Sequence, residues 1–118
     1  MIPFVDLAAQ YAEIANDFEG ELLQILRKCQ FTGGTYLDRF ERALAAYLGV
    51  HQVVGVSNGT DAIMLACEAL NIGRNDLVIV PNNSFIASAF GVSRAGAKPL
   101  LCAVDPYTYL LDPDKVEG

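Results

Sequence analysis

The fold is decided by residues 53–104, which read VVGVSNGTDAIMLACEALNIGRNDLVIVPNNSFIASAFGVSRAGAKPLLCAV. Three short apolar runs predict strands, at 53–56, 77–80 and 99–104. Two stretches between them have apolar side chains at helical spacing, 60–70 and 84–95. Short apolar strands that alternate with helices are typical of a mostly parallel sheet with helices on both faces. The pattern therefore predicts an α/β fold.

Two amphipathic helices are predicted before this region, at about 12–28 and 36–48. The opening IPFVDLAAQY, residues 2–11, looks like an extended arm that runs into the first helix. The loop FTGG at 31–34 separates the two helices, and Gly49 is expected to end the second one. The region after residue 104 is a turn-rich tail that looks like a connector.

The composition limits the classes of partner. Hydrophobic residues make up 53% of the 118 residues and charged residues 19%, which suffices for a core and predicts association through exposed apolar surface. The net charge of −6 argues against binding to nucleic acid or to an anionic membrane surface. The sequence opens without a secretion signal and has no apolar run near the roughly 20 residues of a membrane span, so we expect a cytoplasmic protein.

Neither a metal site nor a catalytic group is expected from the motifs. Cys29, Cys67 and Cys102 lie far apart without a CxxC pair, which favours buried thiols in a reducing compartment. His51 is the only histidine, and it follows a helix end, which disfavours both metal ligation and a serine triad. The sequence has no GxxxxGK[ST], GxGxxG or GxSxG motif. The carboxylates lie mainly on helix faces and in the tail, where a solvated surface explains them.

The turn SNGTD, which follows the first predicted strand, has two interpretations. In the first, Ser57 or Asn58 caps the next helix, and Gly59 eases the turn. In the second, the free N–H groups at the helix start and the hydroxyl of Thr60 bind a phosphate. Asp61 counts against an anion site, although its side chain could turn away and cap. The local spacing leaves both interpretations open.

A second loop, Pro81 to Phe85, also follows the carboxyl end of a predicted strand. Ligands of parallel α/β sheets bind at these strand ends, so this loop is a further candidate. Phe85 stands at the start of a predicted helix, and an isolated aromatic residue there is more often part of the core.

Four stretches of the chain, taken in order, resemble the N-terminal portion of the DegT/DnrJ/EryC1/StrS aminotransferases. They are IPFVDLAAQY, FTGGTYLDRFERALAAYLGV, VVGVSNGTDAIMLACEALNIGRNDLVIVPNNSFIASAFGVSRAGAKPLL and VDPYTYLLDPDKVE. These enzymes have fold type I, use pyridoxal phosphate (PLP) and usually aminate keto-sugars attached to nucleotides. The resemblance implies that residues 1–118 form a single, incomplete domain: the N-terminal part of the large domain, preceded by two helices. It also implies PLP, a nucleotide-sugar substrate and a homo-oligomer.

The resemblance implies roles for particular residues. Gly59 and Thr60 would hold the cofactor phosphate through backbone N–H groups and a hydroxyl, and Asp61 would contribute its N–H. Phe85, in the stretch Asn83-Ser84-Phe85, would stack on the pyridine ring, for which a flat apolar face is suited. The loop at 31–34 would lie near the active-site entrance or the dimer contact.

The resemblance also implies what these residues lack. The family's cofactor-binding lysine lies beyond the matched region, and Lys28, Lys98 and Lys115 do not follow its motif. We therefore expect a truncated or partial homologue that is inactive alone. The strand at 53–57 would have no ladder partner, because the family's intervening strands come from later sequence. The alternatives are an oligomerising interaction module and a phosphate-binding domain that does not use PLP.

Overall fold

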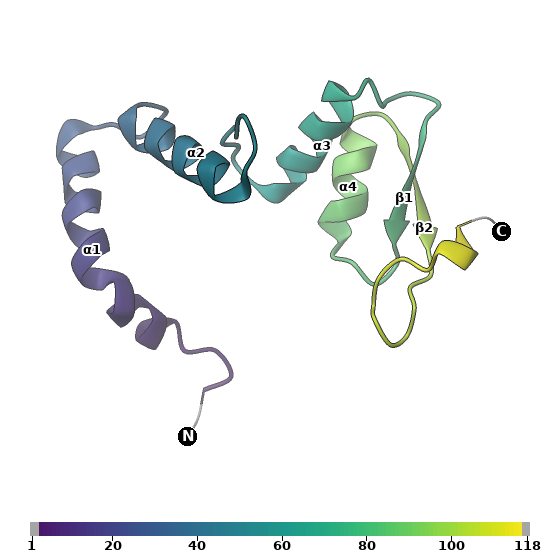
Figure 1. Ribbon diagram of the computed structural model, residues 1–118, viewed down its shortest axis with the longest axis horizontal. Coiled ribbons are helices and arrows are strands. Elements are labelled where there is room, and N and C mark those ends of the chain that lie inside the picture. The colour runs from purple at the N-terminus through teal and green to yellow at the C-terminus, as the bar shows by residue number, and fades with distance from the viewer. Residues whose placement is uncertain (1–2, 117–118) are drawn as a thin grey trace. The chain divides into compact units, whose positions relative to one another are not determined.

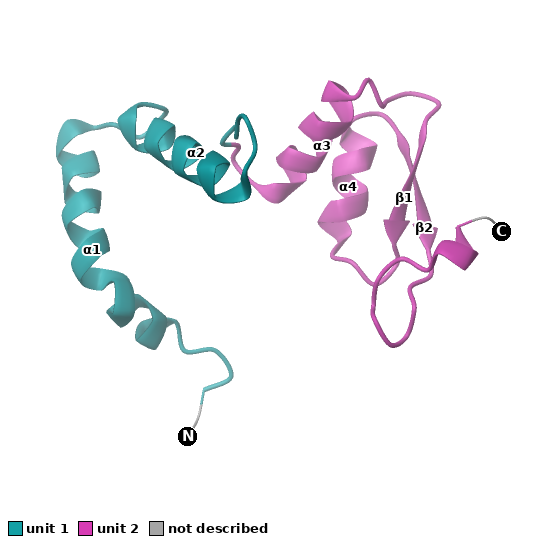
Figure 2. Cartoon of the chain, viewed as in Figure 1, with its two compact units in different colours: residues 1–55 teal, residues 56–118 magenta. Residues whose placement is uncertain are grey.

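Helices and strands alternate only in the second half of the chain. The computed structural model describes residues 3–116 and divides the chain into two compact units, residues 1–55 and 56–118 (Figure 1 and Figure 2). The first unit is helical, and the second unit contains both strands of the described residues. Residue 2 of the predicted arm and residues 117 and 118 of the predicted tail lie outside the described residues.

The first unit contains two helices, α1 (Leu7–Lys28) and α2 (Thr35–Leu48). Helix α1 begins earlier than the predicted residue 12 because the Asp6 side chain caps it, accepting a hydrogen bond of 3.0 Å from the amide of Ala9. Gly49 ends α2 in a left-handed conformation, with φ of 68°, as the sequence predicts.

The predicted strand at 53–56 is not formed, which corrects the sequence prediction. A strand needs a neighbour for its ladder, and the only sheet among the described residues is built from two later strands. The Val54 side chain is 75% exposed, and Val53 and Gly55, at the alternate positions, are only half-buried. Instead, the amide of Gly55 donates a hydrogen bond of 2.7 Å to Glu41 of α2.

The second unit is a helix–strand–helix–strand arrangement. Its elements are α3 (Gly59–Ala69), β1 (Leu77–Pro81), α4 (Ile86–Arg94), β2 (Lys98–Cys102) and a 3-10 helix, η1 (Pro113–Lys115). The strands β1 and β2 pair in parallel, with Val78 opposite Pro99 and Val80 opposite Leu101. The α/β class and the parallel pairing predicted from the sequence are thus confirmed.

The core of the second unit lies between the two helices and the sheet. It is formed by four buried residues, Cys67, Val80, Val92 and Ala97. Helix α4 covers one face of the sheet, and α3 packs against α4. The other face meets the chain near η1, where the Cys102 thiol donates to the Lys115 carbonyl at 3.4 Å. None of the helices within residues 3–116 has the length and apolar character required to cross a bilayer.

Candidate functional site

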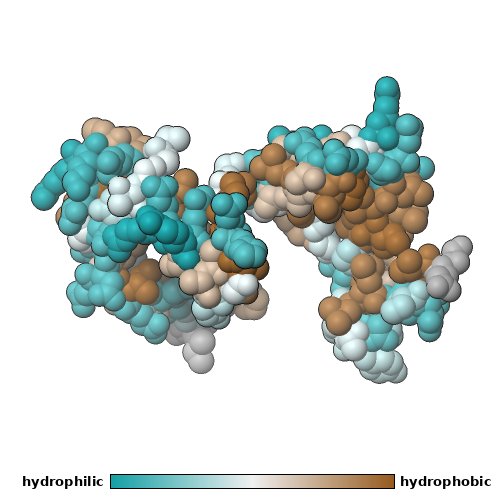
Figure 3. Space-filling view, turned by 45° about the horizontal axis from the view of Figure 1, so that its top comes forward, coloured by the Kyte–Doolittle hydropathy of each residue, from teal (hydrophilic) through white to brown (hydrophobic). Residues whose placement is uncertain are grey.

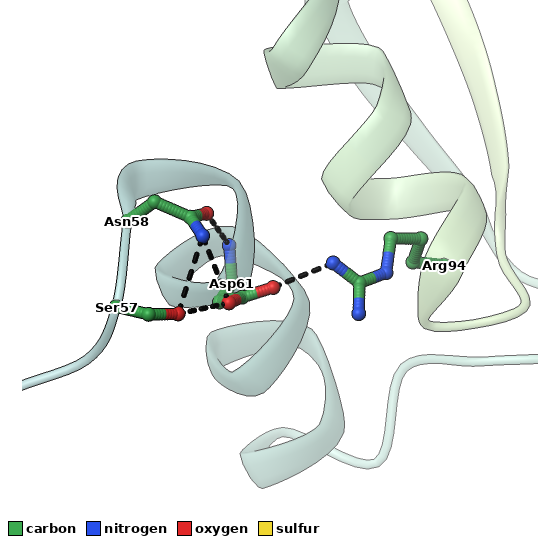
Figure 4. Close-up of polar contacts among 4 residues, drawn as sticks. All are labelled: Ser57, Asn58, Asp61 and Arg94. Atoms are coloured by element: carbon green, nitrogen blue, oxygen red, sulfur yellow. Dashed lines mark hydrogen bonds and ion pairs between the residues drawn. The ribbon is translucent and has the colours of Figure 1, made fainter.

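The start of α3 is a capped turn. Asn58 has an extended backbone, and its side-chain oxygen accepts a hydrogen bond of 2.9 Å from the amide of Asp61 (Figure 4). This contact confirms helix capping and assigns it to Asn58 rather than to Ser57. The cap occupies one of the N–H groups that a helix start leaves without an intrahelical partner.

The amides of Gly59 and Thr60 are the first two of α3. An amide at this position has no carbonyl four residues earlier within the helix to which it can donate. Gly59 is exposed, and a Cβ atom added to it would meet no other atom within 4 Å. Thr60 is half-buried. An anion can therefore approach two free amides and a hydroxyl at the positive end of the helix dipole.

The Asp61 carboxylate is turned into a network of hydrogen-bond donors (Figure 4). It accepts hydrogen bonds from the Ser57 hydroxyl and from the Asn58 side-chain amide, the latter at 3.0 Å. Its other oxygen lies 2.5 Å from the Arg94 guanidinium. The Ser57 hydrogen bond lowers the pKa of Asp61 below its ordinary value, and Arg94 and Asn58 lower that pKa further. The group is thus an anion whose charge is balanced by a neighbouring cation.

Arg94 is the residue of this site that sequence reasoning missed. It lies 33 positions from Asp61, in the last turn of α4, so no local spacing connects the two. Gly91 gave an indirect signal, because a glycine within a helical pattern often marks a close approach. A Cβ atom at Gly91 would lie 2.9 Å from the Thr60 carbonyl and 2.8 Å from Ile63. Helix α4 therefore touches the first turn of α3.

Phe85 stands immediately before α4, at the carboxyl end of β1, and is 78% exposed. The core interpretation of this aromatic residue does not hold for the described structure. Helix α4 begins at Ile86, two residues later than predicted, and the hydroxyls of Ser84 and Ser88 lie 2.6 Å apart across its start. In Figure 1, α3 and α4 both have their N-terminal ends towards the lower part of the view. The ring of Phe85 is free to contact a ligand.

The three lysines and the loop at 31–34 belong neither to the start of α3 nor to the segment just before α4. Lys28 is the last residue of α1, Lys98 is the first of β2, and Lys115 is the last of η1. The loop from Phe31 to Gly34 belongs to the first unit, and Phe31 is 67% exposed.

The donors at the start of α3 and the exposed ring of Phe85 are the types of group that a phosphorylated aromatic cofactor needs. Two amides and the Thr60 hydroxyl can hold the phosphate, and Phe85 offers a flat apolar face. Asp61 fits less simply, because the amide predicted to bind phosphate already donates to Asn58. An anion that used this third amide would have to displace the Asn58 side chain.

Known proteins with similar sequences include sugar aminotransferases. A dTDP-3-amino-3,6-dideoxy-alpha-D-galactopyranose transaminase of Aneurinibacillus thermoaerophilus is 39% identical over 117 residues, which are 99% of this chain and 32% of that protein. A UDP-2-acetamido-2-deoxy-3-oxo-D-glucuronate aminotransferase of Pseudomonas aeruginosa is 37% identical over 118 residues, which are 100% of this chain and 33% of that protein. The chain thus spans about a third of the length of these relatives.

Solved structures of aminotransferases have the same fold as this chain over the region that it covers. DesV of S. venezuelae superposes with a TM-score of 0.92 at 38% identity, over 98% of this chain and 31% of that one. NtdA of Bacillus subtilis, which was solved with the cofactor PMP bound, superposes with a TM-score of 0.90 at 37% identity, over 98% of this chain and 27% of that one. The fold is therefore that of the N-terminal part of a PLP-dependent aminotransferase of fold type I.

The family assignment follows from the extent of these matches. The sequence model of the DegT/DnrJ/EryC1/StrS aminotransferase family matches residues 12–118, which is most of the chain. The chain belongs to the DegT/DnrJ/EryC1/StrS aminotransferase family.

Proposed function

We propose that residues 57–61 and Phe85 form the phosphate-binding and ring-stacking part of the PLP site of a nucleotide-sugar aminotransferase. The observation that carries the proposal is the exposed start of α3, with two amides free of helix partners, in a chain of this family. Bound PLP would supply an electron sink for the chemistry of amino groups. The residues described here would bind it and fix its orientation.

Each residue has a distinct part in this proposal. The amides of Gly59 and Thr60 would donate to the phosphate, and the Thr60 hydroxyl would add a third donor. Phe85 would cover one face of the pyridine ring and keep water from it. The N–H of Asp61 would join the phosphate donors only after the Asn58 cap opens.

The substrate class comes from the relatives. Those described above carry dTDP- and UDP-linked sugars in their names, so we propose a nucleotide-linked keto-sugar for this protein as well. The names of these relatives carry different sugars, so no particular sugar is proposed.

We also propose that none of the lysines in this sequence binds the cofactor covalently and that these 118 residues are inactive alone. Lys28 and Lys115 each end a helix, and Lys98 begins a strand, positions that do not match the family's lysine motif. Incubation with PLP followed by borohydride reduction tests this by mass spectrometry. We expect scattered, substoichiometric labelling, and stoichiometric labelling of one lysine would disprove the proposal.

The phosphate contact is tested with ligands that carry or lack a phosphate group. Titrations with PLP, inorganic phosphate and pyridoxal, followed through the amide NMR signals of Gly59 and Thr60, should show saturable shifts for the first two ligands only. Gly59→Pro removes one donor at a helix position that accepts proline, after a residue that is already extended, so the helix should persist. A lost hydrogen bond to a charged group should weaken phosphate binding by roughly tenfold or more.

A pair of threonine variants, one at the site and one elsewhere, gives a matched control. Thr60→Val removes the proposed hydroxyl donor, and Thr35→Val makes the same change in the first turn of α2, in the other unit. Only the first should weaken binding. Silent signals of Gly59 and Thr60 at saturating PLP would contradict the site, and tighter binding of nucleotides than of PLP would favour a phosphate-binding domain of another kind.

A homo-oligomer is the second proposal, and the apolar surface favours it. Figure 3 shows hydrophobic surface on both units. Helix α1 has no buried residue, and large apolar side chains recur along it at helical spacing: Leu7, Tyr11, Ile14, Phe18, Leu22 and Leu26. Such a stripe is normally covered by protein. Sedimentation should show concentration-dependent association, and a monomer at every concentration would count against it.

A further inference from the structure

The ion pair between Arg94 and Asp61 joins two helices at the point where the phosphate is expected. Arg94 Nη1 lies 2.5 Å from Asp61 Oδ1, and their side chains are 43% and 22% exposed. The absence of a side chain at Gly91 permits this approach, because a Cβ atom there would press on the Thr60 carbonyl. The packing of α4 on α3 thus brings the two side chains within reach of each other.

Asp61 poses an electrostatic problem for an anion at this helix start. Asp61 is the third residue of α3, next to the amides of Gly59 and Thr60. A carboxylate in the first turn already interacts favourably with the helix dipole, so it competes with a phosphate for the same positive field. The Ser57 and Asn58 hydrogen bonds favour the charged form of Asp61, so protonation does not remove the conflict.

We propose that Arg94 is a positioning residue that makes the start of α3 accept an anion. It neutralises the charge of Asp61 and draws the carboxylate towards α4, as Figure 4 shows. The amides of Gly59 and Thr60 then face a ligand without an uncompensated negative charge beside them. This inference rests on the proposed function, and it adds a residue of α4 to a site otherwise built from α3 and Phe85.

A double-mutant cycle on the full chain tests the inference. Inorganic phosphate is titrated while the amide signals of Gly59 and Thr60 are followed by NMR, and every variant is first checked for native signal dispersion. Arg94→Gln should weaken phosphate binding by up to about fivefold, the upper end of the range expected for exposed charge pairs. Asp61→Asn combined with Arg94→Gln should restore the affinity to within about twofold of wild type, because both charges are gone.

Three controls separate charge compensation from simple loss of structure. Arg94→Lys keeps the charge and should bind phosphate nearly as wild type does. Arg74→Gln removes the charge of an exposed arginine of the same unit and should leave the affinity unchanged. Salt at about 1 M should shrink the difference between wild type and Arg94→Gln, because it screens exposed charges.

The outcomes distinguish this inference from the proposed function. If wild type binds phosphate at Gly59 and Thr60 and Arg94→Gln binds equally well, the role of Arg94 is wrong while the phosphate site stands. If the double variant binds phosphate as weakly as Arg94→Gln does, the ion pair only stabilises the packing of the helices, and the inference is again overturned. If wild type shows no response at Gly59 and Thr60, both the site and the role of Arg94 fail.

Discussion

Two stretches of similar composition, VVGV at 53–56 and LVIV at 77–80, have different secondary structure in this protein. The second becomes β1 and pairs with β2, and its Val80 is 5% exposed. The first forms no strand, and its Val54 is 75% exposed. The comparison shows that a β-rich run does not by itself form a strand. It also needs a partner strand and a covering helix, and both come from distant sequence.

The largest expected effect comes from truncating the same residue type in both stretches. Val80→Ala should lower the free energy of unfolding by about 2 kcal/mol, because it removes two buried methyl groups and leaves a small cavity. Val54→Ala should change it by less than about 0.5 kcal/mol, because the side chain is already solvated. Urea unfolding followed by circular dichroism measures both, and hydrogen exchange resolves the two units. Equal losses would mean that 53–56 is buried in the protein in solution.

The glycines of the two regions give the next prediction. Gly91 belongs to α4, which covers β1, and an added Cβ there would meet Ile63 Cβ and the Thr60 carbonyl at 2.8 and 2.9 Å. Overpacking of this kind costs about 1–3 kcal/mol, and the better helix propensity of alanine offsets up to about 1 kcal/mol of it. Gly91→Ala should therefore destabilise the second unit by roughly 1–2 kcal/mol.

Gly55→Ala, in the unpaired stretch, is the matched control. Its added Cβ would lie 2.6 Å from the Leu37 methyl group and 3.3 Å from a Glu41 oxygen, which are both far ends of flexible side chains. These can move aside, so the change should cost less than about 0.5 kcal/mol. A loss as large as that of Gly91→Ala would show that the segment at 53–56 is held more rigidly than its lack of a ladder indicates.

The same contrast explains what could be read from the sequence. The sequence predicts the four α-helices and both strands of the described residues to within about five residues at each end, because helical spacing, short apolar runs and Gly49 are local signals. The prediction of a strand at 53–56 is wrong because a β-rich run is a local signal, whereas the partner strand that it requires is not encoded nearby. The Asn58 cap is one of the two interpretations that the sequence offers. The Arg94–Asp61 pair depends on the packing of two helices, and no local sequence pattern connects residues 33 positions apart.

The turn that follows VVGV is ordered by polar contacts in place of a ladder, and its cap gives a smaller effect. Asn58→Ala removes the acceptor of the Asp61 amide and should destabilise α3 by about 1 kcal/mol. Asn82→Ala truncates an exposed asparagine whose backbone amide, unchanged by the substitution, donates to Cys102. It should have little effect in the same urea experiment. If both variants lose the same stability, the capping assignment is wrong.

The smallest effect concerns acid, and its sign follows from the lowered pKa of Asp61. A carboxyl group whose pKa is lower in the folded state stabilises that state at pH values above its unfolded pKa, about 3.9, and loses this contribution as pH falls through the folded value. The urea midpoint of wild type should therefore fall more steeply below about pH 4 than that of Asp61→Asn. Ser57→Ala and Arg94→Gln should each remove part of this difference, because the Ser57 hydrogen bond and Arg94 both lower the pKa of Asp61. Parallel acid profiles for wild type and Asp61→Asn would mean that the network at the start of α3 does not persist in solution, and the turn after VVGV would then be as loosely held as the stretch before it.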